Sequence, residues 1–218
     1  MEEQRLTPWQ AFKDLLGGHN ERSLVLSVYN PFALKPADFV VVDDVLNGIN
    51  KTHFQITEVD VYRRTIATQN FEFVDYILQG PEDRWLTLRV SENAGLPGTT
   101  ERTLLLLFPD YEGEYDENLH KNVLPSGVLE VKNDAGELIA TYERVHGLKD
   151  PYRADVLVIG ADETPQHESC EYWDFGRNVD GREEFYFVEM NTETGVIRTW
   201  RAVETSQNEL SFLRRTAS

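Results

Sequence analysis

The sequence predicts a mainly β protein in which antiparallel meanders form two packed β units, as a sandwich or a partly open barrel, with one short N-terminal helix. Short runs of β-branched and aromatic residues alternate with turn residues along most of the chain. Only one segment shows strong helical periodicity. Hydrophobic residues make up 40% of the 218 residues, which is enough apolar material for a folded core.

The helix is expected at residues 8–16. Thr7 can serve as its N-cap, and Pro8 suits the first helical position, where a backbone N–H is not needed. The apolar residues that follow fall on one face, and Gly17 and Gly18 end the helix. This pattern is typical of a short helix packed on a sheet.

The first β unit is expected within residues 1–108, where a hairpin loop is expected at residues 79–84 between two of its strands. Its third strand has no clean apolar face, because strict alternation places Glu58 and Asp60 on the same side as Phe54. The strands of this unit are expected at Leu24–Tyr29, Phe39–Val42, Phe54–Tyr62, Phe71–Leu78, Trp85–Val90 and Thr103–Phe108.

An acidic linker or long loop is expected at residues 109–127, bounded by Pro109 and Pro125. The second β unit then covers residues 128–218, and its polar tail from Thr205 is expected to fray or to dock weakly. The strands of the second unit are expected at Val128–Val131, Glu137–Arg144, Val156–Ile159, Cys170–Phe175, Glu184–Met190 and Val196–Val203.

The two units show a similar order of predicted elements. Residues 54–90 and residues 168–203 each contain strands, a hairpin and a final strand with a tryptophan close by or within it. A duplicated three-stranded meander would explain the similarity. Coincidence explains it equally well, since meanders are common.

The charge of the chain excludes some partners and favours others. Asp and Glu number 38 against 21 Lys and Arg, so the formal net charge is −17. Such a surface repels phosphate backbones and anionic lipids, so we expect neither nucleic-acid binding nor direct membrane insertion. It favours a basic protein partner, although solubility alone also explains it.

The sequence favours a cytoplasmic location. Cys170 is the single cysteine, so no intramolecular disulfide can form, which fits a reducing compartment. No apolar run is long enough for a membrane helix, and the N-terminus shows no signal-peptide pattern. We expect Cys170 to be buried on the inner face of a strand and slow to react.

Motifs for enzymatic chemistry are absent from the sequence. The glycine-rich stretch at residues 95–100 lacks the lysine of a phosphate-binding loop. His167 precedes Cys170 by three residues, but residues so spaced point to opposite faces of a strand. We therefore predict no catalytic, cofactor-binding or metal-binding residue, no cofactor and no enzymatic activity.

One acidic stretch leaves an alternative open. The carboxylates between Asp110 and Glu117 could offer oxygen ligands to Ca²⁺ or Mg²⁺. The stretch lacks the ligand order of an EF-hand, so a solvated run of charges is the favoured interpretation.

The densest aromatic cluster lies on one predicted strand, at Tyr172, Trp173, Asp174 and Phe175. Alternation puts Tyr172 and Asp174 on one face and the other two on the opposite face. The strand is then either buried on both sides or presents one face to a protein partner, since Tyr and Trp are enriched at interfaces.

Several of these segments resemble uncharacterised bacterial β-rich families encoded near phage-shock-type membrane-stress proteins. The similar segments are residues 30–34, a strand that ends at Asp43, the strand 73–78 with its partner Trp85, and residues 171–175. The resemblance implies a bacterial, cytoplasmic accessory protein and assigns no functional residue.

Taken together, these patterns favour a non-enzymatic accessory or adaptor protein that acts through protein–protein binding. Residues 172–175 are its predicted binding surface. A small-ligand-binding β-barrel or cleft protein is one alternative. An enzyme of unrecognised type, built on scattered carboxylates, is the other.

Overall fold

The computed structural model describes residues 24–26, 33–66, 69–94, 100–145, 150–162 and 164–215. The helix expected at residues 8–16 lies outside them. The prediction of a mainly β fold is confirmed, because strands dominate the described residues. The strands are β1 (Leu24–Leu26), β2 (Phe39–Val42), β3 (Thr52–Ile66), β4 (Gln69–Gln79), β5 (Trp85–Ala94), β6 (Thr100–Gly113), β7 (Val128–Lys132), β8 (Leu138–Arg144), β9 (Tyr152–Ile159), β10 (Pro165–Val179), β11 (Arg182–Asn191), β12 (Ile197–Glu204) and β13 (Leu210–Arg215). Short helical turns are η2 (Val45–Asn47), η3 (Pro81–Asp83), η4 (Leu119–Val123), α2 (Leu124–Ser126) and η5 (Gln207–Glu209).

Eight of these strands close into one antiparallel barrel. They pair in the order β3, β4, β5, β6, β12, β11, β10 and β9, and β9 pairs with β3 to complete the ring. The expectation of two packed units is therefore corrected. Hydrogen-bonded strands cross the unit boundary expected from the sequence at β6–β12 and β9–β3 in the barrel, and at β13–β2 and β13–β1 outside it.

A β-bulge in β3 decides which side chains face the barrel interior. The pairing of β3 with β4 shifts register between Ile56 and Glu58, so that Thr57 is the extra residue. A bulge of this kind breaks the two-residue alternation. Phe54 and Ile56 consequently face the same outer core as Val59, whereas Asp60 faces the interior. The predicted grouping of Phe54 with Asp60 is thus wrong.

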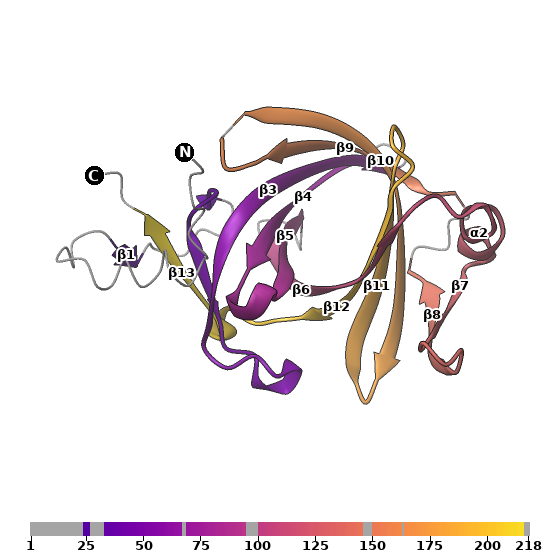
Figure 1. Ribbon diagram of the computed structural model, residues 1–218, viewed down its shortest axis with the longest axis horizontal. Coiled ribbons are helices and arrows are strands. Elements are labelled where there is room, and N and C mark those ends of the chain that lie inside the picture. Colours follow the sequence, from indigo (N-terminus) through magenta and orange to yellow (C-terminus); the bar gives the residue numbers. More distant parts are fainter. Residues whose placement is uncertain are drawn as a thin grey trace, which may run out of the picture.

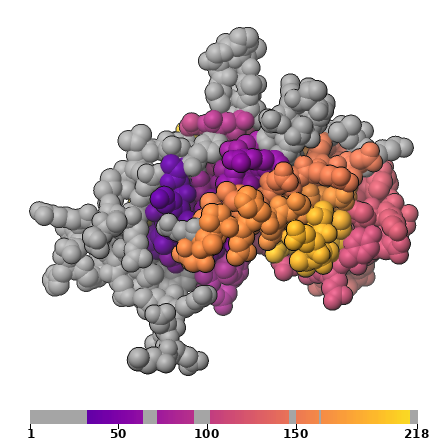
Figure 2. All heavy atoms as spheres, turned by 90° about the horizontal axis from the view of Figure 1, so that it is seen from above, coloured from indigo at the N-terminus to yellow at the C-terminus, as the bar shows by residue number. Residues whose placement is uncertain are grey.

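Two outer layers cover opposite walls of the barrel (Figure 1). β2 and β13 continue the sheet beyond β3, and their apolar side chains form an outer core with the outer face of β3–β6. The β7–β8 hairpin, with η4 and α2, packs over the outer face of β10–β12. In the space-filling view the indigo residues lie on the left side of the coloured atoms and the pink residues of the β7–β8 layer on the right side (Figure 2).

The stretch expected as a linker is largely regular structure. β6 continues through Pro109 to Gly113, and η4 and α2 follow. Pro109 is tolerated in the strand because it lies opposite Trp200, where the β6–β12 pairing shifts register. The side chain of Asp116 accepts a hydrogen bond from the backbone N–H of Leu119 and so caps the helical turns.

The tail expected to fray forms β13 instead. It pairs with β2 and β1, and Leu210 and Phe212 are buried in the first outer core. The polar residues from Thr205 to Glu209 concealed this strand, because they form the η5 turn that precedes it. None of the helices among the described residues is long and apolar enough to cross a membrane.

Candidate functional site: a charged cavity inside the barrel

The barrel interior holds polar and charged side chains from strands that are not neighbours. Tyr62 on β3 donates a hydrogen bond of 2.7 Å to Glu189 on β11, across the barrel. Arg89 on β5 donates to the hydroxyl of Tyr172 on β10, also across the barrel. These contacts show which side chains face the interior of the barrel. Polar and charged groups therefore occupy part of that interior, in place of an aliphatic core.

Arg89 fills the middle of the barrel. Its guanidinium binds both carboxylate oxygens of Asp75, at 2.8 and 2.6 Å, and both side chains are buried. Aromatic rings surround the same group, with Phe73 at 4.2 Å and Phe187 at 4.6 Å from the guanidinium carbon to the ring centroids. The charge of Arg89 is therefore fully matched by carboxylate and π-faces, and the group forms a floor for the space beside it.

A cavity of about 420 Å³ lies beside this floor, towards the end of the barrel where β5 begins and β6 ends. Its size falls in the range of small-molecule sites. The lining residues come from β3, β4, β5, β6 and β12: Glu58, Asp60, Tyr62, Asp75, Ile77, Trp85, Leu86, Thr87, Pro109, Asp110, Tyr111, Glu112, Arg198, Thr199 and Trp200.

Asp60 is the unusual group in this cavity. Only 6% of the residue is exposed, and none of the described residues hydrogen-bonds to its Oδ1. It lies directly opposite Asp75 in the β3–β4 pairing, but Asp75 has Arg89 as its partner. On the other side, in β9, it meets Val158, which offers no donor. Burying a carboxylate oxygen without a partner is costly, so the position calls for a donor that none of the described residues supplies.

The surroundings hold the pKa of Asp60 well above its ordinary value. Burial is the main cause, and the nearby carboxylates of Glu58, Asp75 and Glu189 add to it, against a smaller opposing effect of Arg198. Burial also raises the pKa of Glu58 and that of Glu189. Because these carboxyl groups lie close enough to raise one another's pKa, a positive charge placed among them would favour their ionised forms and be stabilised by them.

The rim combines aromatic and charged side chains. Trp85 is 42% exposed, and Trp200 is partly buried and stands on the interior face of β12. Arg198 binds Glu112 through its Nε, at 3.2 Å, and lies next to Glu189 across the β11–β12 pair. The site thus offers flat apolar surfaces near the entrance and an unpartnered carboxylate inside.

The predicted binding surface on β10 is corrected. Tyr172, Trp173, Asp174 and Phe175 are all buried, so none of them faces solvent. Tyr172 and Asp174 belong to the barrel interior, and the other two pack under the β7–β8 hairpin and the helical turns. The alternative of a strand buried on both sides is the one that the structure shows.

The prediction that Cys170 is buried on the inner face of a strand is confirmed. Cys170 is buried on the interior face of β10. Burial, and after it the carboxylate of Glu189, raises the pKa of its thiol, which opposes formation of the reactive thiolate. His167 is exposed on the opposite face of the strand, so the two do not form a catalytic pair.

In the acidic stretch, the carboxylates of Asp110, Glu112 and Glu117 each interact with a different partner. Tyr186 donates to Asp110, Arg198 pairs with Glu112, and Lys121 pairs with Glu117 at 2.7 Å. Among the residues that the structure describes, no three His, Cys, Asp or Glu side chains are placed to hold a metal ion.

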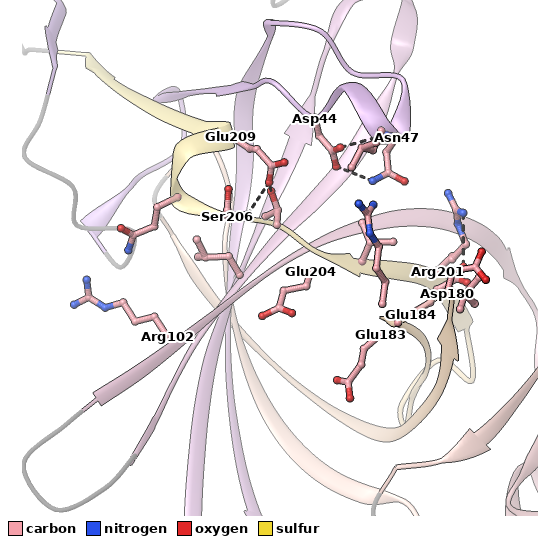
Figure 3. A pocket seen from close by; sticks show the side chains of 18 residues that line it. Asp44, Asn47, Arg102, Asp180, Glu183, Glu184, Arg201, Glu204, Ser206 and Glu209 are labelled. Carbon is pink, nitrogen blue, oxygen red and sulfur yellow. Dashed lines mark hydrogen bonds and ion pairs between the residues drawn. The ribbon is translucent and has the colours of Figure 1, made fainter.

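A second, larger hollow lies outside the barrel, against β11, β12 and η5 (Figure 3). One of its buried carboxylates, that of Glu184, accepts hydrogen bonds from Tyr142 and Arg177 and lies 3.6 Å from Arg201. Glu209 is likewise held, by the backbone N–H of Ser206 at 2.8 Å. These groups satisfy one another, so this groove lacks the unmet bonding that distinguishes the barrel cavity.

Sequence reasoning missed the cavity, although one signal was present. The run from Phe54 to Tyr62 lacked a clean apolar face, because strict alternation put the acidic Glu58 and Asp60 on the same side as Phe54. That conflict between local pattern and burial is typical of functional positions. Arg198 gave no local signal because its partner Glu112 lies 86 positions away, and Arg89, although opposite Asp75 in a predicted hairpin, gave no sign that this pair is buried.

Comparisons with protein-family models, with curated proteins and with solved structures found no match to this chain.

Proposed function

We propose that the protein binds a small organic cation inside its barrel. The positively charged nitrogen of the ligand lies against Asp60, and its apolar body lies against Trp85 and Trp200. The observation that carries the proposal is the buried Oδ1 of Asp60, which lacks a hydrogen-bond partner among the described residues. An ammonium group would supply both the missing donor and the missing charge.

The rest of the cavity supports a cation over an anion or a neutral molecule. Glu58 and Glu189 surround Asp60 in the interior, so an anion would meet repulsion from several carboxylates. The exposed face of Trp85 suits an organic cation, because aromatic rings attract positive charge. Protein–protein binding, the function that the sequence favoured, loses the surface on which it was based, since residues 172–175 are buried.

The test is a titration with 2-phenylethylamine, followed by tryptophan fluorescence and by calorimetry. We expect saturable binding, and we expect Asp60→Asn to weaken it about tenfold or more, because a hydrogen bond to a charged group is lost. Asp155→Asn is the matched control, since Asp155 is exposed on the outer face of β9. Equal affinity in the Asp60 variant, or no binding by the wild type at millimolar amine, overturns the proposal.

Binding should also depend on pH with a definite sign. Because its pKa is raised, chiefly by burial, Asp60 holds its proton to a higher pH than an exposed carboxyl does, and an approaching cation favours the carboxylate. Binding therefore releases protons, and the affinity rises with pH until Asp60 is fully ionised. The groups facing Asp60 are Glu58, Asp75 and Glu189, with Arg198 opposing them. Calorimetry in two buffers of different ionisation enthalpy measures the protons released.

A further inference from the structure

Arg198 lines the cavity, and Glu112 uses only part of the hydrogen-bonding capacity of its guanidinium group. Its Nε binds Glu112 at 3.2 Å, the one hydrogen bond that joins the side chain of Arg198 to another described residue, and 43% of this side chain is exposed. Glu112 therefore fixes the direction of the guanidinium without occupying its outer edge. That edge carries two parallel donors, the arrangement that binds a carboxylate through both oxygens.

The charge of Arg198 acts on the same carboxylates as the ligand would. It opposes the effect of burial at Glu58, Asp60 and Glu189, so its guanidinium is close enough to influence all three. It also lines the cavity together with Asp60. Among the described residues, the cavity thus presents Asp60, whose Oδ1 lacks a hydrogen-bond partner, and Arg198, which is bonded through its Nε alone.

We infer that the ligand is a zwitterion, with an ammonium group on Asp60 and a carboxylate on Arg198, as in an amino acid that has an aromatic or apolar side chain. The inference rests on the proposed function, because it assigns the second charge of the same ligand. In an amino acid the two opposite charges lie a few bonds apart, and Trp85 and Trp200 supply an apolar surface for the side chain of the ligand.

Three probes of the same shape separate the two charges: L-phenylalanine has both, 2-phenylethylamine lacks the carboxylate, and 3-phenylpropionate lacks the ammonium. We expect the wild type to bind L-phenylalanine about tenfold more tightly than the amine, and the acid most weakly. If the amine binds as tightly as L-phenylalanine, the zwitterion is refuted while the proposed cation site stands. If the amine does not bind at millimolar concentration, the proposed function itself fails.

Substitution of the arginine gives the sharper result. Arg198→Gln should weaken L-phenylalanine about tenfold and leave the amine unchanged or tighter, because a competing positive charge is removed. The matched control is Arg63→Gln, since Arg63 binds Glu72 through its Nε at 3.0 Å in the same manner, but exposed on the outer face. Equal weakening of both probes by Arg198→Gln would show a merely structural role and overturn the inference.

Discussion

Removal of the charge of Asp60 should stabilise the protein at neutral pH. Asp60→Asn keeps the shape of the side chain, which is 6% exposed, and deletes a charge whose Oδ1 has no described partner. An unsatisfied buried group costs about 1–3 kcal/mol, and more when charged. For a chain of this length each kcal/mol shifts Tm by about 2–4 °C, so we expect a rise of roughly 2–12 °C near pH 8.

The gain should depend on pH in one direction only. The pKa of Asp60 is raised in the folded protein, chiefly by burial, so the folded state holds the proton more tightly than the unfolded chain. That contribution to stability is fully present below the unfolded pKa of about 3.9 and is lost as pH rises through the folded pKa. Asp60→Asn has no such titration, so its advantage over the wild type should grow with pH and vanish near pH 4.

The assay is a series of thermal melts of both proteins from pH 4 to pH 8, with the exposed Asp155→Asn as a control that should show no such trend. A difference in Tm that is independent of pH would mean that Asp60 is not strained by its surroundings. A loss of stability at pH 8 would mean that its carboxylate has a partner, and the argument for a ligand there would fail.

Three further predictions test the interior and the layers around it. Native Cys170 should react with a thiol reagent far more slowly than the denatured chain, since burial raises the pKa of its thiol; rapid stoichiometric labelling of the folded protein would contradict this. Trp173→Ala should lower the free energy of unfolding by about 3–5 kcal/mol in a denaturant titration, and a cost below about 1 kcal/mol would show that the outer core is loosely packed. Arg89→Met should cost about 3–5 kcal/mol because Asp75 is left buried without its counter-charge, and adding Asp75→Leu should recover much of that loss; additive losses in the double variant would argue against a coupled pair.

Local pattern predicted the strands well and their arrangement poorly. The hairpin between Tyr76 and Leu88 follows from alternation and from the turn residues between them, and the structure has it. The ring closure does not follow, because the pairing of Val59 with Ile159 joins residues 100 positions apart and leaves no trace in either segment. The one indication in the sequence was the mixed apolar and acidic composition of the segment that forms β3, which the structure buries on both faces.

The candidate site was hidden for a related reason. Alternation is a reliable guide only while a strand is regular, and the bulge at Thr57 inverts it just before Asp60. A one-residue change of register exchanges the two faces of a strand. No residue type between Phe54 and Tyr62 predicts the bulge. The interior position of Asp60 is therefore known only from the strand pairing in the structure.

The closure of the barrel between β3 and β9 also shapes how the chain reaches its folded state. Until β9 pairs with β3, water can reach Arg89 and Asp60, and the low-dielectric interior does not yet exist. Joining segments so distant in sequence carries the entropy loss of a long loop, and dehydrating the interior charges adds to the barrier in the same step. We therefore expect the closure of β9 on β3, which also encloses the cavity, to be the slow step of folding.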